Sequence, residues 1–193
     1  VTRAEHGTCV AGAATAATNN GIGLSSTGYN CNLYFAPSVK QDSIHPYDYM
    51  IKMAQEGAKV IIICNGGLWY VSEFQIAINE IYDMGAVIVV AAGNIPSVSP
   101  IYPGYYDNVI SVTSVGHLHD PSSDGPLPGE VNVKDCIEEI IGDPSTTNTL
   151  NDRVDICAPG YHISALDTGN SYYSVWGTSI AAPQVGGVCG LIF

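Results

Sequence analysis

The sequence is poor in basic residues and in charge of either sign. Its 193 residues include 6 Lys or Arg and 18 Asp or Glu, a net charge of −12 at pH 7. Nucleic acids and anionic membrane surfaces repel such a chain, so neither is an expected partner. No apolar run approaches the roughly 20 residues of a membrane-spanning helix, and no Asn-x-Ser/Thr acceptor for N-glycosylation occurs. We therefore expect no membrane span.

The six cysteines form no C-x-x-C pair and none of the short spacings of a zinc site. Several stand in apolar runs, such as Cys64 in IIICN and Cys189 in GGVCGL, where a buried thiol is the usual state of cysteine. Most of the six are therefore expected to be free core thiols. One or two disulfides are the alternative, and the sequence does not specify their pairing.

Apolar, β-branched runs alternate with helical patterns along the chain, which is 46% hydrophobic. Residues 60–64 and 86–91 are continuous apolar runs, typical of strands buried on both faces. Residues 47–56 and 73–84 space their apolar side chains as amphipathic helices, and a glycine follows each. This rhythm predicts a three-layer α/β fold with a mainly parallel sheet flanked by helices. Shorter strands are expected at 33–36, 109–115, 154–157 and 163–166.

Residues 117–153 interrupt this rhythm. The segment is rich in Pro, Asp, Ser and Gly, so we expect a surface insertion with one short helical piece at 133–141. The chain is otherwise interpreted as a single domain spanning residues 1–193. His117, His119 and Asp120 form an H-x-H-D run with the donor types of a metal site, but a solvated loop is the preferred interpretation and we assign no metal.

A serine near the C-terminus is expected at a turn. Gly177-Thr178-Ser179 precedes a run of small apolar residues, which predicts that Ser179 lies at or just inside a helix N-terminus. The free N–H groups and the dipole favour negative charge there, as a serine nucleophile needs for its developing oxyanion. Serine is also a common helix cap, so the motif by itself leaves both interpretations open.

Two further polar side chains fall at the ends of expected elements. His6 precedes a helix-compatible run of small residues, and Asn94 follows the strand expected at 86–91. A nucleophile, a general base and an amide donor are the groups that acyl transfer needs. Considered without the other two residues, His6 could equally be a surface residue or a helix cap rather than a catalytic base.

Three segments together resemble the subtilisin-like serine proteases, namely HGTCVAG from His6, AAGN up to Asn94 and GTSIAAP around Ser179. Similarity continues at residues 19–23, 60–67, 102–103, 109–115 and 154–160, and only the insertion falls outside it. The resemblance implies a serine endopeptidase that cleaves peptide bonds through an acyl-enzyme on Ser179. It also implies that His6 is the general base and that Asn94 donates to the oxyanion. The fold that it implies is subtilisin-like.

The resemblance implies a peptide-binding groove as well. One segment matches the strand that pairs with the substrate backbone in this family, and another matches a wall of the primary specificity pocket. Peptide recognition by strand addition is physically reasonable at such a place. Asn65 stands where the family often has an apolar residue, so the subsite preference stays open. The implied substrate-binding residues are Cys64, Asn65, Gly66, Ala91, Ala92 and Gly93.

Two parts of the family pattern are missing from the sequence. The triad aspartate precedes the histidine by tens of residues in the family, whereas residues 1–5 alone precede His6 here. Glu5 is no substitute, because neighbouring helix positions point in different directions. The family fold also continues beyond the serine helix. We therefore expect an incomplete domain of a longer chain, with the triad Asp outside it and with little or no activity by itself.

The resemblance carries expectations about cofactors, partners and location. It implies no required cofactor, although some members hold structural calcium at the region matched by residues 19–23, through loop oxygens. A peptide or protein substrate and the remaining segments of the same longer chain are the expected partners. Secretion or the cell surface is the expected location. The alternative function is a catalytically dead pseudoprotease that retains a peptide-binding groove.

Overall fold

A four-stranded parallel sheet forms the centre of the computed structural model, which describes residues 3–36, 45–95, 97–116, 148–149, 151–161 and 163–193. The strand order is β1-β2-β3-β4. The predicted parallel sheet is thereby confirmed. The strands are β1 (Val60–Ile63), β2 (Val87–Ala91), β3 (Ile110–Val115) and β4 (Ile156–Pro159).

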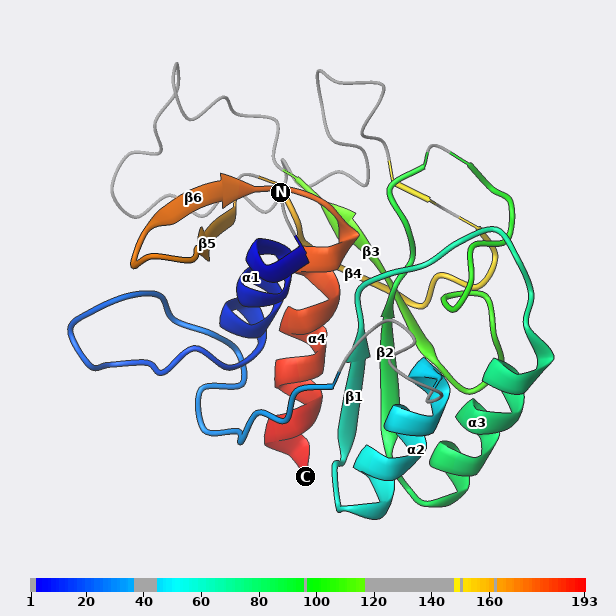
Figure 1. Cartoon of the computed structure of the whole chain (residues 1–193). Helices are drawn as coiled ribbons and strands as arrows, with labels where there is room; N and C mark the ends of the chain where they lie inside the picture. Colours follow the sequence, from blue (N-terminus) through cyan, green and yellow to red (C-terminus); the bar gives the residue numbers. More distant parts are fainter. Residues whose placement is uncertain (1–2, 37–44, 96, 117–147, 150, 162) are drawn as a thin grey trace.

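Helices cover both faces of this sheet (Figure 1). Helix α4 (Thr178–Ile192) crosses all four strands, and α1 (Arg3–Thr15) packs on α4. Helices α2 (Pro46–Gln55) and α3 (Ser72–Asp83) cover β1 and β2 on the other face. Successive side chains of a strand point to opposite faces, so Val90 packs with the α2 and α3 cluster while Val89 packs with the α4 cluster. The three-layer prediction is confirmed.

A two-stranded antiparallel hairpin stands apart from the main sheet. It consists of β5 (Ile163–Leu166) and β6 (Tyr172–Val175), and β5 packs against α1. The sequence analysis predicted β5 but missed β6, because the alternation in YYSV is weak and its partner is needed to make it a strand. The turn residues between the two strands, Asp167 to Ser171, were the signal for a hairpin.

Residues 33–36 were predicted to form a strand, and this prediction is wrong for the structure. They have no regular secondary structure and belong to no sheet among the described residues. Leu33, Tyr34 and Phe35 are all exposed. A strand is defined by the ladder that it makes with a neighbouring strand, and residues 33–36 make no ladder with any described strand.

The expected insertion lies mostly outside the described residues, as do its helical piece at 133–141 and the residues His117, His119 and Asp120. At its C-terminal side, Thr149 is fully buried and its N–H donates to the Gly93 carbonyl at 3.0 Å. The chain therefore returns to the core of the domain beside the end of β2.

Five cysteines lie within the described residues, and all five are free thiols. Cys9 is buried, and Cys31, Cys64 and Cys189 are partly buried. Cys157 on β4 is exposed, so the expected core environment does not hold for this one. Cys136 lies outside the described residues.

Candidate active site

Asn94 joins the end of β2 to the N-terminus of α4. Its Oδ1 accepts hydrogen bonds from the backbone N–H and from the hydroxyl of Thr178, both at 2.8 Å. The Thr178 hydroxyl in turn accepts the Gly93 N–H at 3.1 Å. None of the described residues accepts a hydrogen bond from Asn94 Nδ2, a group that can only donate. The network therefore fixes the orientation of the amide, and its two N–H donors have no acceptor among the described residues.

Thr178 is a site residue that the sequence analysis missed. It is fully buried, and its partners Gly93 and Asn94 stand 85 and 84 positions earlier in the chain. A role that depends on contacts over that separation leaves no local pattern. The only signal was its place in the GTS motif.

Ser179 lies in the first turn of α4, as the sequence predicts. The N-cap is Gly177 with φ 120°, a conformation that favours glycine. A Cβ at position 177 would also lie 2.7 Å from Asn94 Nδ2, so the glycine gives the amide its room. The Ser179 side chain is partly buried, and its Oγ donates to the Cys64 carbonyl at 3.3 Å.

His6 lies in the first turns of α1 and is partly buried. Burial disfavours the charged imidazolium and lowers the pKa of His6 below its ordinary 6.5. A neutral imidazole at pH 7 is the form that can accept a proton. Within the described residues no hydrogen bond joins His6 to Ser179, although His6 and Cys64 line one cavity.

The contact between α1 and α4 brings His6 toward the serine helix. A Cβ at Gly187 would meet Thr27 Oγ1, Gly28 N and Ala14 O, all closer than 3.0 Å. Thr27 Oγ1 also donates to the Gln184 carbonyl at 2.7 Å. Backbone atoms of α1, of the loop after it and of α4 are therefore in direct contact. This contact fixes the position of α1 relative to α4.

The segment after β1 is held against the loop that contains Tyr102. Gly67 and Tyr102 exchange two backbone hydrogen bonds of 2.8 Å, and a Cβ at Gly66 would lie 2.6 Å from the Tyr102 carbonyl. Asn65 and Gly66 are exposed. The predicted segment Cys64-Asn65-Gly66 is thus held in place at Gly66 and Gly67, with Asn65 and Gly66 exposed.

The ends of β1 and β2 lie together at the edge of the sheet where α4 begins. Ala91 and Ala92 are buried, and Gly93 has φ 116°. Parallel sheets carry their sites at the carboxyl ends of the strands. The structure therefore gathers the predicted residues 64–66 and 91–94 with Ser179 at one edge.

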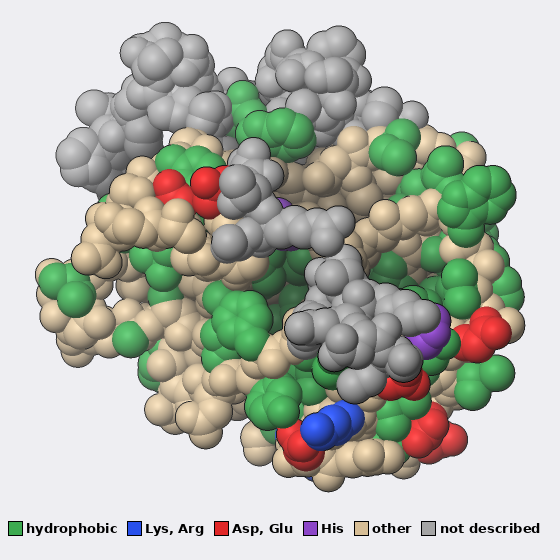
Figure 2. All heavy atoms as spheres, in the orientation of Figure 1, with side chains coloured by type: hydrophobic (Ala, Val, Ile, Leu, Met, Phe, Trp, Pro, Cys, Tyr) green, Lys and Arg blue, Asp and Glu red, His purple; other side chains and the backbone are tan. Residues whose placement is uncertain are grey.

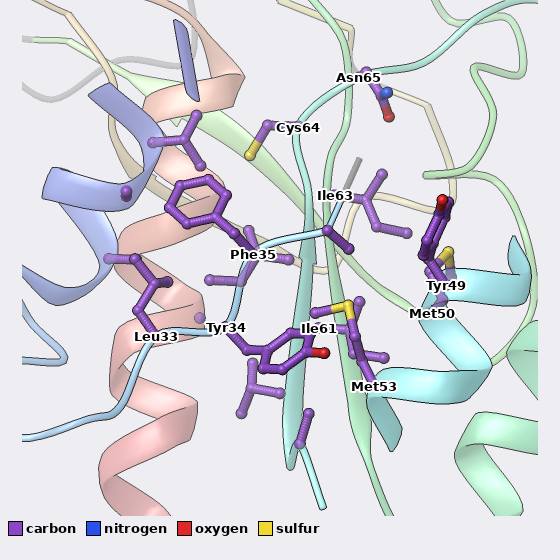
Figure 3. Close-up of a pocket in the computed structure, with 18 of the residues that line it drawn as sticks. Leu33, Tyr34, Phe35, Tyr49, Met50, Met53, Ile61, Ile63, Cys64 and Asn65 are labelled. Carbon is purple, nitrogen blue, oxygen red and sulfur yellow. The ribbon is translucent and has the colours of Figure 1, made fainter. Parts of the chain in front are cut away.

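A cavity of about 1380 Å³ runs along the free edge of β1. Figure 3 shows Leu33, Tyr34 and Phe35 on one side, residues of α2 such as Met53 on the other, and β1 between them. His6, Cys64 and residues at the C-terminal half of α4 also line it. Apolar groups thus form most of the cavity wall that the figure draws.

β1 has the composition of an inner strand but stands at the edge of the sheet. Its four residues, VIII, are all apolar and β-branched, and it pairs only with β2 in the part of the chain that the structure describes. Natural edge strands normally carry charges, proline or bulges that prevent pairing. The free edge of β1 therefore lacks the features that protect an exposed edge, as expected for a strand that pairs with a neighbour on both sides.

Charge and metal ligands are sparse around these residues. On the face shown in Figure 2, apolar side chains outnumber charged ones and acidic side chains outnumber basic ones. The described residues contain no group of three or more His, Cys, Asp or Glu side chains that could hold a metal ion. No helix in the described ranges is long and apolar enough to cross a membrane.

Comparisons with known proteins identify the family of the chain. The model of the subtilase family, Peptidase S8, matches residues 2–193. Thermitase from Thermoactinomyces vulgaris is 32% identical over 191 residues, which are 97% of this chain and 60% of that protein. A halolysin-like extracellular serine protease from Natrialba magadii is 29% identical over 190 residues, 96% of this chain and 31% of that protein.

A solved protease from Pseudoalteromonas arctica has the same fold, with a TM-score of 0.71 and 28% identity over 97% of this chain and 57% of that one. The chain spans about 60% or less of the length of these relatives. Because the family model covers nearly every residue and the parallel sheet agrees with it, the chain belongs to the subtilase family of serine peptidases.

Proposed function

We propose that this chain is the part of a subtilisin-like serine endopeptidase that carries the nucleophile, the general base and the oxyanion hole. The observation that carries the proposal is the Asn94 network. Oδ1 is occupied by two hydrogen bonds from Thr178, so the Nδ2 donors stay free beside the first turn of the serine helix. Donors fixed before the reaction are what an oxyanion needs.

The reaction follows from these groups. Ser179 Oγ attacks the carbonyl carbon of the peptide bond while the neutral His6 imidazole takes the hydroxyl proton. Asn94 Nδ2 and the Ser179 N–H stabilise the resulting oxyanion. His6 then gives the proton to the departing amine, and a water molecule hydrolyses the acyl-enzyme by the same steps in reverse order. The lowered pKa of His6 keeps the base neutral at pH 7.

The exposed backbone of Asn65 and Gly66 supplies the substrate contact. The Gly67–Tyr102 bridge holds the segment in place, so a peptide can add to it as a strand. The resemblance makes Ala91, Ala92 and Gly93 the proposed wall of the adjacent specificity pocket, and the side chains of Ala91 and Ala92 are buried in this structure.

The cavity along β1 supports the expectation that the triad Asp lies outside these residues. Its apolar walls, the exposed Leu33 to Phe35 segment and an edge of β1 that is unpaired among the described residues fit a further parallel strand. His6 and Cys64 also line this cavity. A carboxylate on such a strand would reach His6 and orient it, and without it this chain has little activity of its own.

Steady-state cleavage of a fluorogenic peptide by the full-length protein tests the proposal. Ser179→Ala and His6→Ala should each lower kcat by about 10⁴- to 10⁶-fold, because the members of such a unit act together. Tyr82→Ala, at an exposed tyrosine on α3, is the matched control and should keep its activity. Wild-type turnover no faster than that of Ser179→Ala would refute the proposal.

A pseudoprotease is the second candidate, and one observation favours it. Ser179 Oγ donates to the Cys64 carbonyl and not to His6. In a pseudoprotease this contact would persist in the full-length protein, which would bind peptides at residues 64–66 without cleaving them. Peptide binding with equal affinity in wild type and Ser179→Ala, together with no cleavage, would establish this candidate.

Three further expectations remain part of the proposal. The relatives include a protease named as extracellular, which supports secretion or a cell-surface location. Residues 19–23 form an exposed loop with Asn19, Gly21 and Gly23 at positive φ, and a structural calcium ion bound by loop oxygens there is proposed, with no cofactor required for the reaction. The partners are a peptide or protein substrate and further segments of the same chain.

A further inference from the structure

Cys9 makes two polar contacts that join α1 to the β5–β6 hairpin. Its side chain is 1% exposed. Sγ donates to the Leu166 carbonyl at 3.4 Å and lies 3.0 Å from the Tyr173 hydroxyl oxygen. Because the thiol proton is used on Leu166, the Tyr173 hydroxyl is the donor to Sγ. One side chain of α1 is therefore bonded to both strands of the hairpin.

Cys9 lies where α1, which carries His6, packs against α4, which carries Ser179. Cys9 packs in a buried cluster with Ala165 of β5, Val175 of β6 and Ile180 of α4. Ile180 directly follows Ser179. A Cβ at Gly12 would lie 2.9 Å from Leu166 Cδ1, so α1 rests directly on β5. The hairpin thus touches both helices.

Cys9 follows His6 by three positions, so the two side chains lie on neighbouring sides of one helix face. Apolar packing has no directional preference and allows a helix to roll slightly about its axis. Hydrogen bonds have a preferred direction. The contacts of Cys9 therefore restrict a rotation that would move His6 relative to Ser179.

On this geometry, and resting on the proposed function, we propose that Cys9 and Tyr173 are positioning residues that hold the His6 imidazole in its working direction toward Ser179. Neither residue touches the substrate. A misplacement of about 1 Å in a catalytic group costs on the order of 10²-fold in rate, so a small roll of α1 is enough to matter.

The state of the phenol is consistent with this role. The hydrogen bond with Cys9 raises the pKa of Tyr173 to about 12. Asp167 and Glu5 act on it in the same direction. The hydroxyl therefore keeps its proton near neutral pH, where it can donate to Cys9.

The test uses single variants of the full-length protein in the fluorogenic peptide assay. Tyr173→Phe removes the hydroxyl and retains the ring, and Cys9→Ala removes both contacts. Each should lower kcat by about 10- to 100-fold with KM unchanged. Cys9→Ser keeps a donor and an acceptor and should recover most of the loss. Tyr172→Phe, at the neighbouring and exposed tyrosine of β6, should equal wild type.

A second measurement does not depend on activity. The His6 ring resonances in an NMR spectrum should shift in Tyr173→Phe and stay in place in Tyr172→Phe. Unmoved His6 resonances, or a Tyr173→Phe variant with the kcat of Tyr172→Phe, would overturn the inference. Wild-type protein that cleaves no peptide would overturn the proposed function instead, and the His6 resonances would then decide the inference alone.

Discussion

Asn94 has two ends with separate tasks. The oxygen closes the N-terminus of α4 by accepting two hydrogen bonds from Thr178, and the nitrogen is the proposed donor to the oxyanion. A substitution that removes only the second task can therefore separate stability from catalysis.

Asn94→Asp is such a substitution. The carboxylate still accepts from Thr178, and its charge suits a helix N-terminus, so the thermal midpoint should be unchanged or higher. The two N–H donors are lost and a negative charge faces the oxyanion, so kcat should fall by about 10²- to 10³-fold or more. Peptide kinetics and thermal unfolding of the full-length protein measure the two effects. Equal kcat in variant and wild type would remove Asn94 from the oxyanion hole.

The cysteines differ in their expected reactivity. Burial raises the pKa of the Cys64 thiol to about 12, so at pH 8 only about one molecule in 10⁴ carries the thiolate. Cys157 is exposed. Iodoacetamide at pH 8 should therefore modify Cys157 first and leave Cys64 largely intact, as followed by peptide mass spectrometry. Modification of Cys64 at the rate of Cys157 would contradict the burial of its thiol.

At the scale of elements, glycines set the distance between α1 and α4. The position of Gly187 has backbone atoms of Gly28 and Ala14 within 3.0 Å of an added Cβ, and backbone cannot move aside as a side chain can. Gly7 on α1 has nothing within 4 Å of an added Cβ. Alanine at position 187 and alanine at position 7 therefore make a matched test and control.

Gly187→Ala should lower the free energy of unfolding by about 1–3 kcal/mol through overpacking. Gly7→Ala should raise it by about 0.5–1 kcal/mol, since alanine loses less backbone entropy in a helix. Urea denaturation of both variants measures the two changes. A Gly187→Ala variant as stable as wild type would show that α1 and α4 do not meet at backbone contact.

The sequence predicts the elements whose signal is local. The continuous apolar runs of β1 and β2 and the glycines after α2 and α3 placed these elements within one or two residues. Ser179 was likewise placed at a helix N-terminus by the small residues around it. The strand expected at 33–36 and the unpredicted β6 depend instead on whether a partner lies beside them.

The same difference applies to the site. His6, Asn94 and Ser179 stand in motifs and could be found from the sequence. Thr178 and the Cys9–Tyr173 contact could not, because they join residues 84 and 164 positions apart. Hydrogen bonds over such separations follow from the packing of elements and leave no periodic pattern in the chain.

At the scale of the whole molecule, the cavity along β1 is the largest departure from a closed α/β domain. A parallel strand buried on both faces needs a neighbour at each edge to satisfy its backbone groups. β1 has one neighbour, β2, among the described residues. The cavity, with the exposed residues Leu33 to Phe35 along it, is the place where a second neighbouring strand would lie.

Hydrogen exchange can detect the proposed strand. In the 193-residue chain, the β1 amides that point away from β2 should exchange rapidly, because no described residue accepts their hydrogen bonds. In a longer protein that fills the cavity with a strand, these amides should be among the most protected. Residue-resolved exchange on both proteins makes the comparison. Equal exchange of these outward-pointing amides in the two proteins would exclude strand addition at this edge.

The central claim is that Ser179 is an activated nucleophile. A fluorophosphonate reacts with the serine of a working site and not with an ordinary hydroxyl, because it needs the base and the oxyanion hole. Native full-length protein should carry one adduct, located on Ser179 by peptide mass spectrometry, and unfolded protein or the His6→Ala variant should carry none. An unlabelled Ser179 in the native protein, or labelling that persists without His6, would contradict the account.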